Sequence, residues 1–89
     1  MDLAEIRETL THIDTEILDL LGQRFQLIPA IVAEKQKLTL ASFQPEREKE
    51  LFQFYETQAQ QKGLNSEFVH RIFALIFDEM RTCQDNHKN

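Results

Sequence analysis

Glycine and proline are scarce in this chain, with two of each in 89 residues. The alternation of Val, Thr and aromatic residues that marks half-buried strands is missing as well. Together these absences exclude a β-rich fold and favour helix throughout. We therefore predict an all-α fold in a single domain that spans residues 1–89.

Cysteine and histidine are also rare. Cys83 is the only cysteine, which excludes an internal disulfide and a cysteine-rich metal cluster. His12, His70 and His87 lie far apart and form no closely spaced pair of the kind that binds zinc. We predict no metal site and no other cofactor.

Positive charge is in deficit, with 10 Lys and Arg against 15 Asp and Glu and a net charge of −5. Non-specific nucleic-acid binding needs a basic face, so no nucleic-acid partner is expected. The chain is 42% hydrophobic and 28% charged, an ordinary soluble composition, and no membrane association is expected. The first residues lack the cationic and apolar regions of a signal peptide, so we expect a cytoplasmic location.

The first predicted helix runs from Leu3 to Leu38, and Asp2 and Glu5 have the spacing of a capping box at its start. A helix of about 36 residues is about 54 Å long, whereas a compact domain of this size is about 31 Å across. The two later helices line one side of it and leave the other side of its apolar stripe uncovered. A second copy is the simplest cover, so we predict an intertwined homodimer.

Two shorter helices follow a break at residues 39–44. The second covers Glu46–Lys62, with Pro45 in its opening turn and Gly63 just past its end. Asn65 caps the third helix, which extends to Gln84 ahead of a polar tail at residues 85–89.

Arg24 and Glu34 interrupt two apolar rows of the first helix. These rows are Leu3, Leu10, Ile17, Arg24, Ile31, Leu38 and Ile6, Ile13, Leu20, Leu27, Glu34. A guanidinium in an apolar seam keeps its charge and is costly to desolvate unless an anion meets it. Arg24 is therefore either half of an ion pair, with Glu34 or another carboxylate, or a binding residue for an anionic ligand.

Lys35 lies on nearly the same helix face as Arg24, about 20° round and about 16 Å further along. Arg7 lies about 100° round from Arg24 and about 26 Å away, so it reaches the same small ligand only from a second, antiparallel chain. A solvated helix face also explains Arg7 and Lys35. Gln84 ends an apolar stripe on the third helix, where it either faces solvent or serves a site.

Nearly the whole chain resembles the all-helical (AroQ-type) chorismate mutase family, with no gap. The resemblance rests on Ile6-Arg7, Ile13-Asp14, Leu20-Leu21-Gly22-Gln23-Arg24, Lys35, Arg47-Glu48, Gly63-Leu64 and Gln84 in this order. It implies a dimer of three-helix chains, with each active site completed by an arginine from the other chain. It also implies the Claisen rearrangement of chorismate, a small dicarboxylate, to prephenate.

The same resemblance implies individual roles. Arg24 and the partner's Arg7 hold the substrate carboxylates, and Lys35 and Gln84 meet the ether oxygen of the breaking bond. The catalytic residues are thus Lys35, Gln84 and Arg24.

Two neighbouring positions on the second helix complete the implied substrate site. Glu48 takes the ring hydroxyl, and Arg47 contributes mainly through its backbone. Bidentate arginines suit carboxylates, and a lysine offers a compact charge for one oxygen.

Three residues depart from the family pattern. Gln44 stands where many members have an aspartate, and Met80 replaces a frequent serine, so the substrate loses possible contacts at both positions. Pro29 lies inside the first helix and is expected to kink it between Arg24 and Lys35.

Other functions remain open for this fold. Isochorismate pyruvate lyases also lack the aspartate and have a proline before a Glu-Arg pair, and another branch acts on 4-amino-4-deoxychorismate. A non-catalytic helical dimerisation or regulatory module is the alternative from a different class. It explains the heptads, but it does not explain Arg24, Lys35 and Gln84 together.

Overall fold

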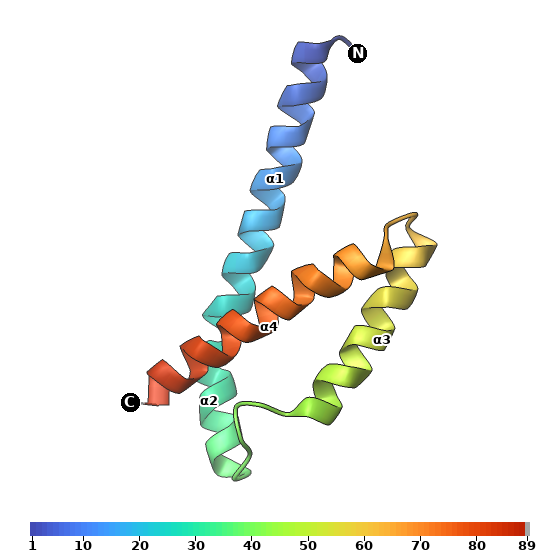
Figure 1. The fold of residues 1–89 in the computed structure, drawn as a ribbon. Helices are drawn as coiled ribbons and strands as arrows, with labels where there is room; N and C mark the ends of the chain where they lie inside the picture. The colour runs from blue at the N-terminus through green and yellow to red at the C-terminus, as the bar shows by residue number, and fades with distance from the viewer. Residues whose placement is uncertain (89) are drawn as a thin grey trace.

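The computed structural model describes residues 1–88, which form four α-helices joined by short connections (Figure 1). The helices are α1 (Leu3–Gln26), α2 (Ile28–Lys37), α3 (Pro45–Gln61) and α4 (Ser66–Lys88). α1 and α2 join along a bent axis and correspond to the predicted first helix, and α3 and α4 correspond to the second and third. The all-α prediction is confirmed for these residues. None of their helices is both long enough and apolar enough to cross a bilayer.

The predicted continuous helix from Leu3 to Leu38 is wrong at Leu27, where the chain makes a turn between α1 and α2. In an unbroken helix, Pro29 would lack its hydrogen bond and its ring would collide with the carbonyl group one turn earlier. Instead, the Leu27 N–H donates to the Arg24 carbonyl at 3.2 Å, and Pro29 lies in the first turn of α2, where no donor is needed. The predicted kink between Arg24 and Lys35 is confirmed.

Side-chain caps at two helix starts also agree with the prediction. The Asp2 carboxylate accepts the Glu5 N–H at 2.8 Å, and the Asn65 side chain accepts the Phe68 N–H at 2.8 Å. Each cap satisfies a backbone donor that has no partner within the helix.

Two helices end through a residue with positive φ. Gly63 has φ 73° after α3, and Thr39 has φ 56° after α2. The predicted end of the third helix at Gln84 is wrong, because α4 continues through the polar residues that follow it to Lys88. Asn89 lies outside the described residues.

α4 packs against both α3 and α2. Towards α3 the contact is aromatic, with Tyr55 stacked on Phe73 at 4.2 Å between ring centroids. Towards α2, Met80 joins Ile28 and Val32 in a buried cluster. α4 is therefore the element that holds the chain together.

α1 extends away from the other helices (Figure 1), and none of its residues is buried. The prediction that both later helices line the first from end to end is wrong, because α4 packs on its second part, α2, whereas α3 packs on α4. The radius of gyration is 16.3 Å, against about 12 Å for a compact chain of this length. An apolar stripe remains exposed along α1: Leu3, Ile6, Leu10, Ile13, Ile17 and Leu20.

Candidate functional site

Lys35 and Gln84, which are 49 positions apart in the chain, form a direct hydrogen bond. The Lys35 ammonium donates to Gln84 Oε1 at 2.9 Å and to the Ser42 carbonyl at 3.0 Å. Gln84 is only 5% exposed and Lys35 is half-buried. The packing of α2 on α4 therefore brings together the two residues that the family resemblance assigns to the ether oxygen. A solvent-facing Gln84, the alternative left open above, is excluded.

This contact orients the Gln84 amide. Its oxygen faces Lys35, so its NH₂ group is directed elsewhere and keeps its two donors. No hydrogen bond among residues 1–88 uses that nitrogen, and no polar side-chain atom among them is both fully buried and without a partner. Lys35 and Gln84 together thus present a positive charge and a neutral donor.

Arg24, near the end of α1, contacts α4 at Phe77, seven positions before Gln84. Its guanidinium carbon lies 5.7 Å from the centre of the Phe77 ring, a cation–π contact, and its side chain is half-buried. The proposed ion pair with Glu34 is wrong, because Glu34 is exposed and instead accepts from Lys37 at 3.1 Å. No carboxylate in residues 1–88 lies within ion-pair distance of Arg24. Arg24 also lines a largely apolar groove of about 770 Å³ between α1, α3 and α4.

Glu48, predicted to take the ring hydroxyl, pairs with Arg81 of α4 through a hydrogen-bonded ion pair. The hydrogen bond to Glu48 raises the pKa of Arg81, against the opposing effect of burial. Arg81 also lies 3.4 Å from Asp78 and 4.8 Å from the centre of the Phe43 ring. Contacts to three residues therefore fix the guanidinium.

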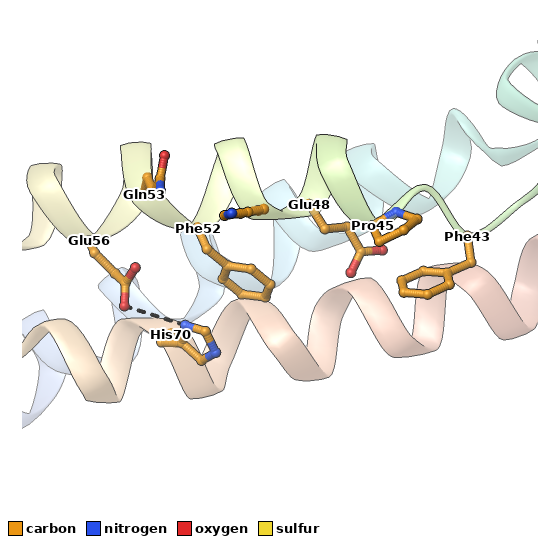
Figure 2. Close-up of a pocket in the computed structure, with 8 residues that line it drawn as sticks. Phe43, Pro45, Glu48, Phe52, Gln53, Glu56 and His70 are labelled. Atoms are coloured by element: carbon orange, nitrogen blue, oxygen red, sulfur yellow. Dashed lines mark ion pairs between the residues drawn. The ribbon is translucent and has the colours of Figure 1, made fainter.

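The Glu48 carboxylate borders a cavity of about 400 Å³ between α3 and α4 (Figure 2). Phe43, Pro45 and Phe52 line the same cavity, and an ion pair between Glu56 and His70, 3.4 Å apart, marks its far end. The ring of Phe52 stacks on His70 at 4.1 Å. Lys49 lines the cavity as well, so aromatic rings and charges of both signs border this opening.

The connection between α2 and α3 links these groups. The Ser42 hydroxyl donates to the Asp85 carboxylate at 2.6 Å, and its carbonyl accepts from Lys35. The next residue, Phe43, contacts Arg81. A continuous chain of contacts therefore runs from Gln84 and Lys35 through the loop to the Glu48 ion pair.

The remaining predicted residues do not join the chain of contacts that links Gln84 and Lys35 to the Glu48 ion pair. Arg7 is exposed on the free part of α1, and exposed Arg47 pairs with Glu50 at 3.7 Å. Gln44 precedes α3 without a side-chain cap and, with Arg47, lines a separate hollow of about 600 Å³. Met80 is buried against α2 rather than open to a cavity. Their roles toward a substrate stay predictions.

Sequence reasoning missed Arg81, Ser42 and Asp85. Arg81 precedes Gln84 by three residues and therefore lies close to it on the surface of α4. That spacing was an available signal, but it does not identify the partner on another helix. In the described part of the chain, no three side chains of His, Cys, Asp and Glu come together as a metal site would require.

The chain is similar to known proteins over almost its full length. The family model for chorismate mutase type II matches residues 6–85. A bifunctional chorismate mutase/prephenate dehydratase from Buchnera aphidicola is 30% identical, and the match covers 97% of this chain but only 25% of that protein. A chorismate mutase from Methanocaldococcus jannaschii is 26% identical over 96% of this chain and 86% of the relative.

Proposed function

Because the chain belongs to the chorismate mutase type II family, we propose that it catalyses the rearrangement of chorismate to prephenate. The observation that carries this proposal is the contact at 2.9 Å between Lys35, which is half-buried, and Gln84, which is buried. A merely structural helical module has little need of a buried amide that is bonded to a half-buried lysine, because an apolar pair would pack at lower cost.

The reaction is unimolecular: a carbon–oxygen bond breaks while a carbon–carbon bond forms within the same molecule. It needs neither a nucleophile nor an obligatory proton transfer. The protein has two tasks, to hold the dicarboxylate in a compact conformation and to stabilise the negative charge that grows on the ether oxygen. Arg24 and the partner's Arg7 perform the first task by binding the two carboxylates.

Lys35 and Gln84 perform the second task. The Lys35 ammonium supplies a charge, and the free NH₂ of Gln84 supplies a neutral donor that does not depend on pH. Because each already holds the other, little reorganisation is needed when charge develops.

The active form is proposed to be an intertwined homodimer. The chain exposes 6911 Å², against about 5,400 Å² for a compact monomer of 10.5 kDa. Much of the excess comes from the apolar stripe of α1, which a second α1 matches in length and character. In the same arrangement, the Arg7 of each chain reaches the site of the other chain, whereas it lies too far from the site of its own chain.

Incubation with pure chorismate tests the proposal. NMR identifies the product, because prephenate and chorismate are isomers of equal mass. We expect prephenate, and parallel incubations with isochorismate and 4-amino-4-deoxychorismate test the related activities. Release of pyruvate from isochorismate without prephenate from chorismate would favour the lyase, and no reaction with any of the three would favour the non-catalytic module.

A further inference from the structure

The ion pair between Glu48 and Arg81 is the least exposed one in residues 1–88, with side chains 20% and 25% exposed. The other pairs are more open to solvent, such as Arg71 with Glu67 at 61% and 83%. Water screens a pair in this position only weakly, so its charges act strongly on a ligand group that binds next to it. The Glu48 carboxylate has Arg81 on one side and borders an open cavity.

The positive charge of Arg81 changes which chemical groups the Glu48 carboxylate can bind. A free carboxylate attracts a cation and also accepts a hydrogen bond from a hydroxyl group. With a guanidinium already bound, the negative charge is largely cancelled, but the oxygens keep spare acceptor capacity. A neutral hydroxyl therefore still gains a hydrogen bond, whereas an ammonium group meets a nearby positive charge.

Position 44 contributes to the same balance. It carries Gln44, a neutral residue, just before α3 and four positions before Glu48, so it adds no negative charge at this end of α3. Asp78 balances part of the Arg81 charge, but at 3.4 Å and with its own side chain 75% exposed it is the weaker partner.

We propose that Arg81 is a specificity-determining residue that makes the site select a neutral ring hydroxyl over a ring ammonium group. This inference rests on the proposed function, in which Glu48 receives the ring substituent. Chorismate has a hydroxyl there, and 4-amino-4-deoxychorismate has an amine that is protonated at neutral pH. Arg81 acts through Glu48 and is a positioning residue rather than a catalytic one.

The test compares kcat/KM for these two compounds in the parent and in Arg81→Met, which keeps an extended side chain without the charge. We expect the preference for chorismate over the amine to fall by on the order of tenfold, because one nearby unit charge is removed. If the amine is not turned over, its inhibition constant against chorismate replaces kcat/KM. Arg81→Lys retains the charge and is expected to retain most of the preference.

Arg71→Met is the matched control, because it removes an arginine of the same helix whose carboxylate partner is exposed. It is expected to leave the preference unchanged. An Arg81→Met protein with correct helix content but an unchanged preference overturns the inference, since a purely structural loss lowers both activities together. If Arg81→Met does not fold, Arg81→Gln replaces it as the variant without the charge. It is compared with Arg81→Lys, which keeps the charge, and an unchanged preference in Arg81→Gln overturns the inference. A parent that rearranges neither compound instead overturns the proposed function, and this inference with it.

Discussion

In the proposed mechanism, Lys35 and Gln84 serve one task, the stabilisation of the ether oxygen, with two chemically different groups. Lysine brings a full charge, while the amide adds a donor whose protonation never changes in the ordinary pH range. The hydrogen bond between them fixes the orientation of the amide and directs its NH₂ away from Lys35. Any substitution that gives Gln84 a titratable group therefore makes the reaction depend on pH.

Gln84→Glu is expected to confine activity to acid pH. Only the protonated carboxyl donates a hydrogen bond, and its ionised form repels the growing negative charge. Lys35 favours the ionised form, so activity falls as pH rises and is low at neutral pH. The measurement is kcat against pH, with the exposed Gln60→Glu as a control that keeps the parental profile. A flat, parental profile for Gln84→Glu would show that Gln84 does not contact the breaking bond.

Gln84→Ala is expected to lower kcat by roughly 10²- to 10³-fold with a smaller change in KM, by analogy with oxyanion-hole donors. Steady-state kinetics with chorismate measures both constants. A change confined to KM would mean that Gln84 binds substrate and transition state equally.

Arg24→Leu is expected to abolish activity without lowering the melting temperature. Arg24 has no carboxylate partner in residues 1–88, and only its contact with Phe77 is lost, while leucine suits the apolar groove around it. Circular dichroism during heating gives the melting temperature, and Arg71→Leu serves as the surface control. Marked destabilisation would show that Arg24 has a structural role.

Among the secondary-structure elements, the ends of α2 and α3 differ in one instructive respect. After each helix an N–H reaches back five residues, from Leu40 to Lys35 and from Leu64 to Ala59, both at 2.8 Å. This closure needs a residue with positive φ, and α3 provides Gly63 whereas α2 uses Thr39. A β-branched residue in that conformation is strained.

Thr39→Gly is therefore expected to stabilise the protein by roughly 0.5–1 kcal/mol, after allowing for the greater freedom of glycine in the unfolded chain. Gly63→Ala, the converse change, is expected to destabilise it by about 1 kcal/mol. Denaturant unfolding followed by circular dichroism measures both free energies of unfolding. A loss of stability in Thr39→Gly would show that the threonine side chain makes a compensating interaction.

Local signals in the sequence predicted most of these elements. Asp2, Asn65, Gly63 and Pro29 act on backbone groups within a few residues, so their effects follow from spacing alone. The extension of α4 to residue 88 was missed because polar residues carry no signal against a solvated helix. The bend was predicted from Pro29, but the single turn residue at Leu27, where the helix is interrupted, was not.

The candidate site was predictable only in part. Arg24 attracted notice because it interrupts an apolar row, Lys35 because it shares a helix face with Arg24, and Gln84 because it ends an apolar stripe. Arg81 did not, because its importance arises from Glu48, which lies 33 positions away on another helix. Contacts between helices depend on how the helices pack, which no local spacing encodes.

At the scale of the whole molecule, the single chain leaves the apolar stripe of α1 exposed, which supports the proposal that a dimer is the active species. We expect light scattering to give about 21 kDa, twice the chain mass of 10.5 kDa, at micromolar concentration. Dilution far below this range is expected to lower activity per chain as dimers dissociate. A folded monomer that remains active at every concentration would contradict the shared site.

The central claim is that each active site combines Arg24, Lys35 and Gln84 of one chain with the partner's Arg7. Mixing Arg7→Ala with Arg24→Ala chains tests it most directly, because each variant alone has no site with both arginines. After subunit exchange in an equal mixture, half of the dimers are mixed and each has one intact site, so we expect about 25% of parental activity. Native mass spectrometry of differently tagged chains verifies the exchange. Mixed dimers without any recovered activity would contradict the claim.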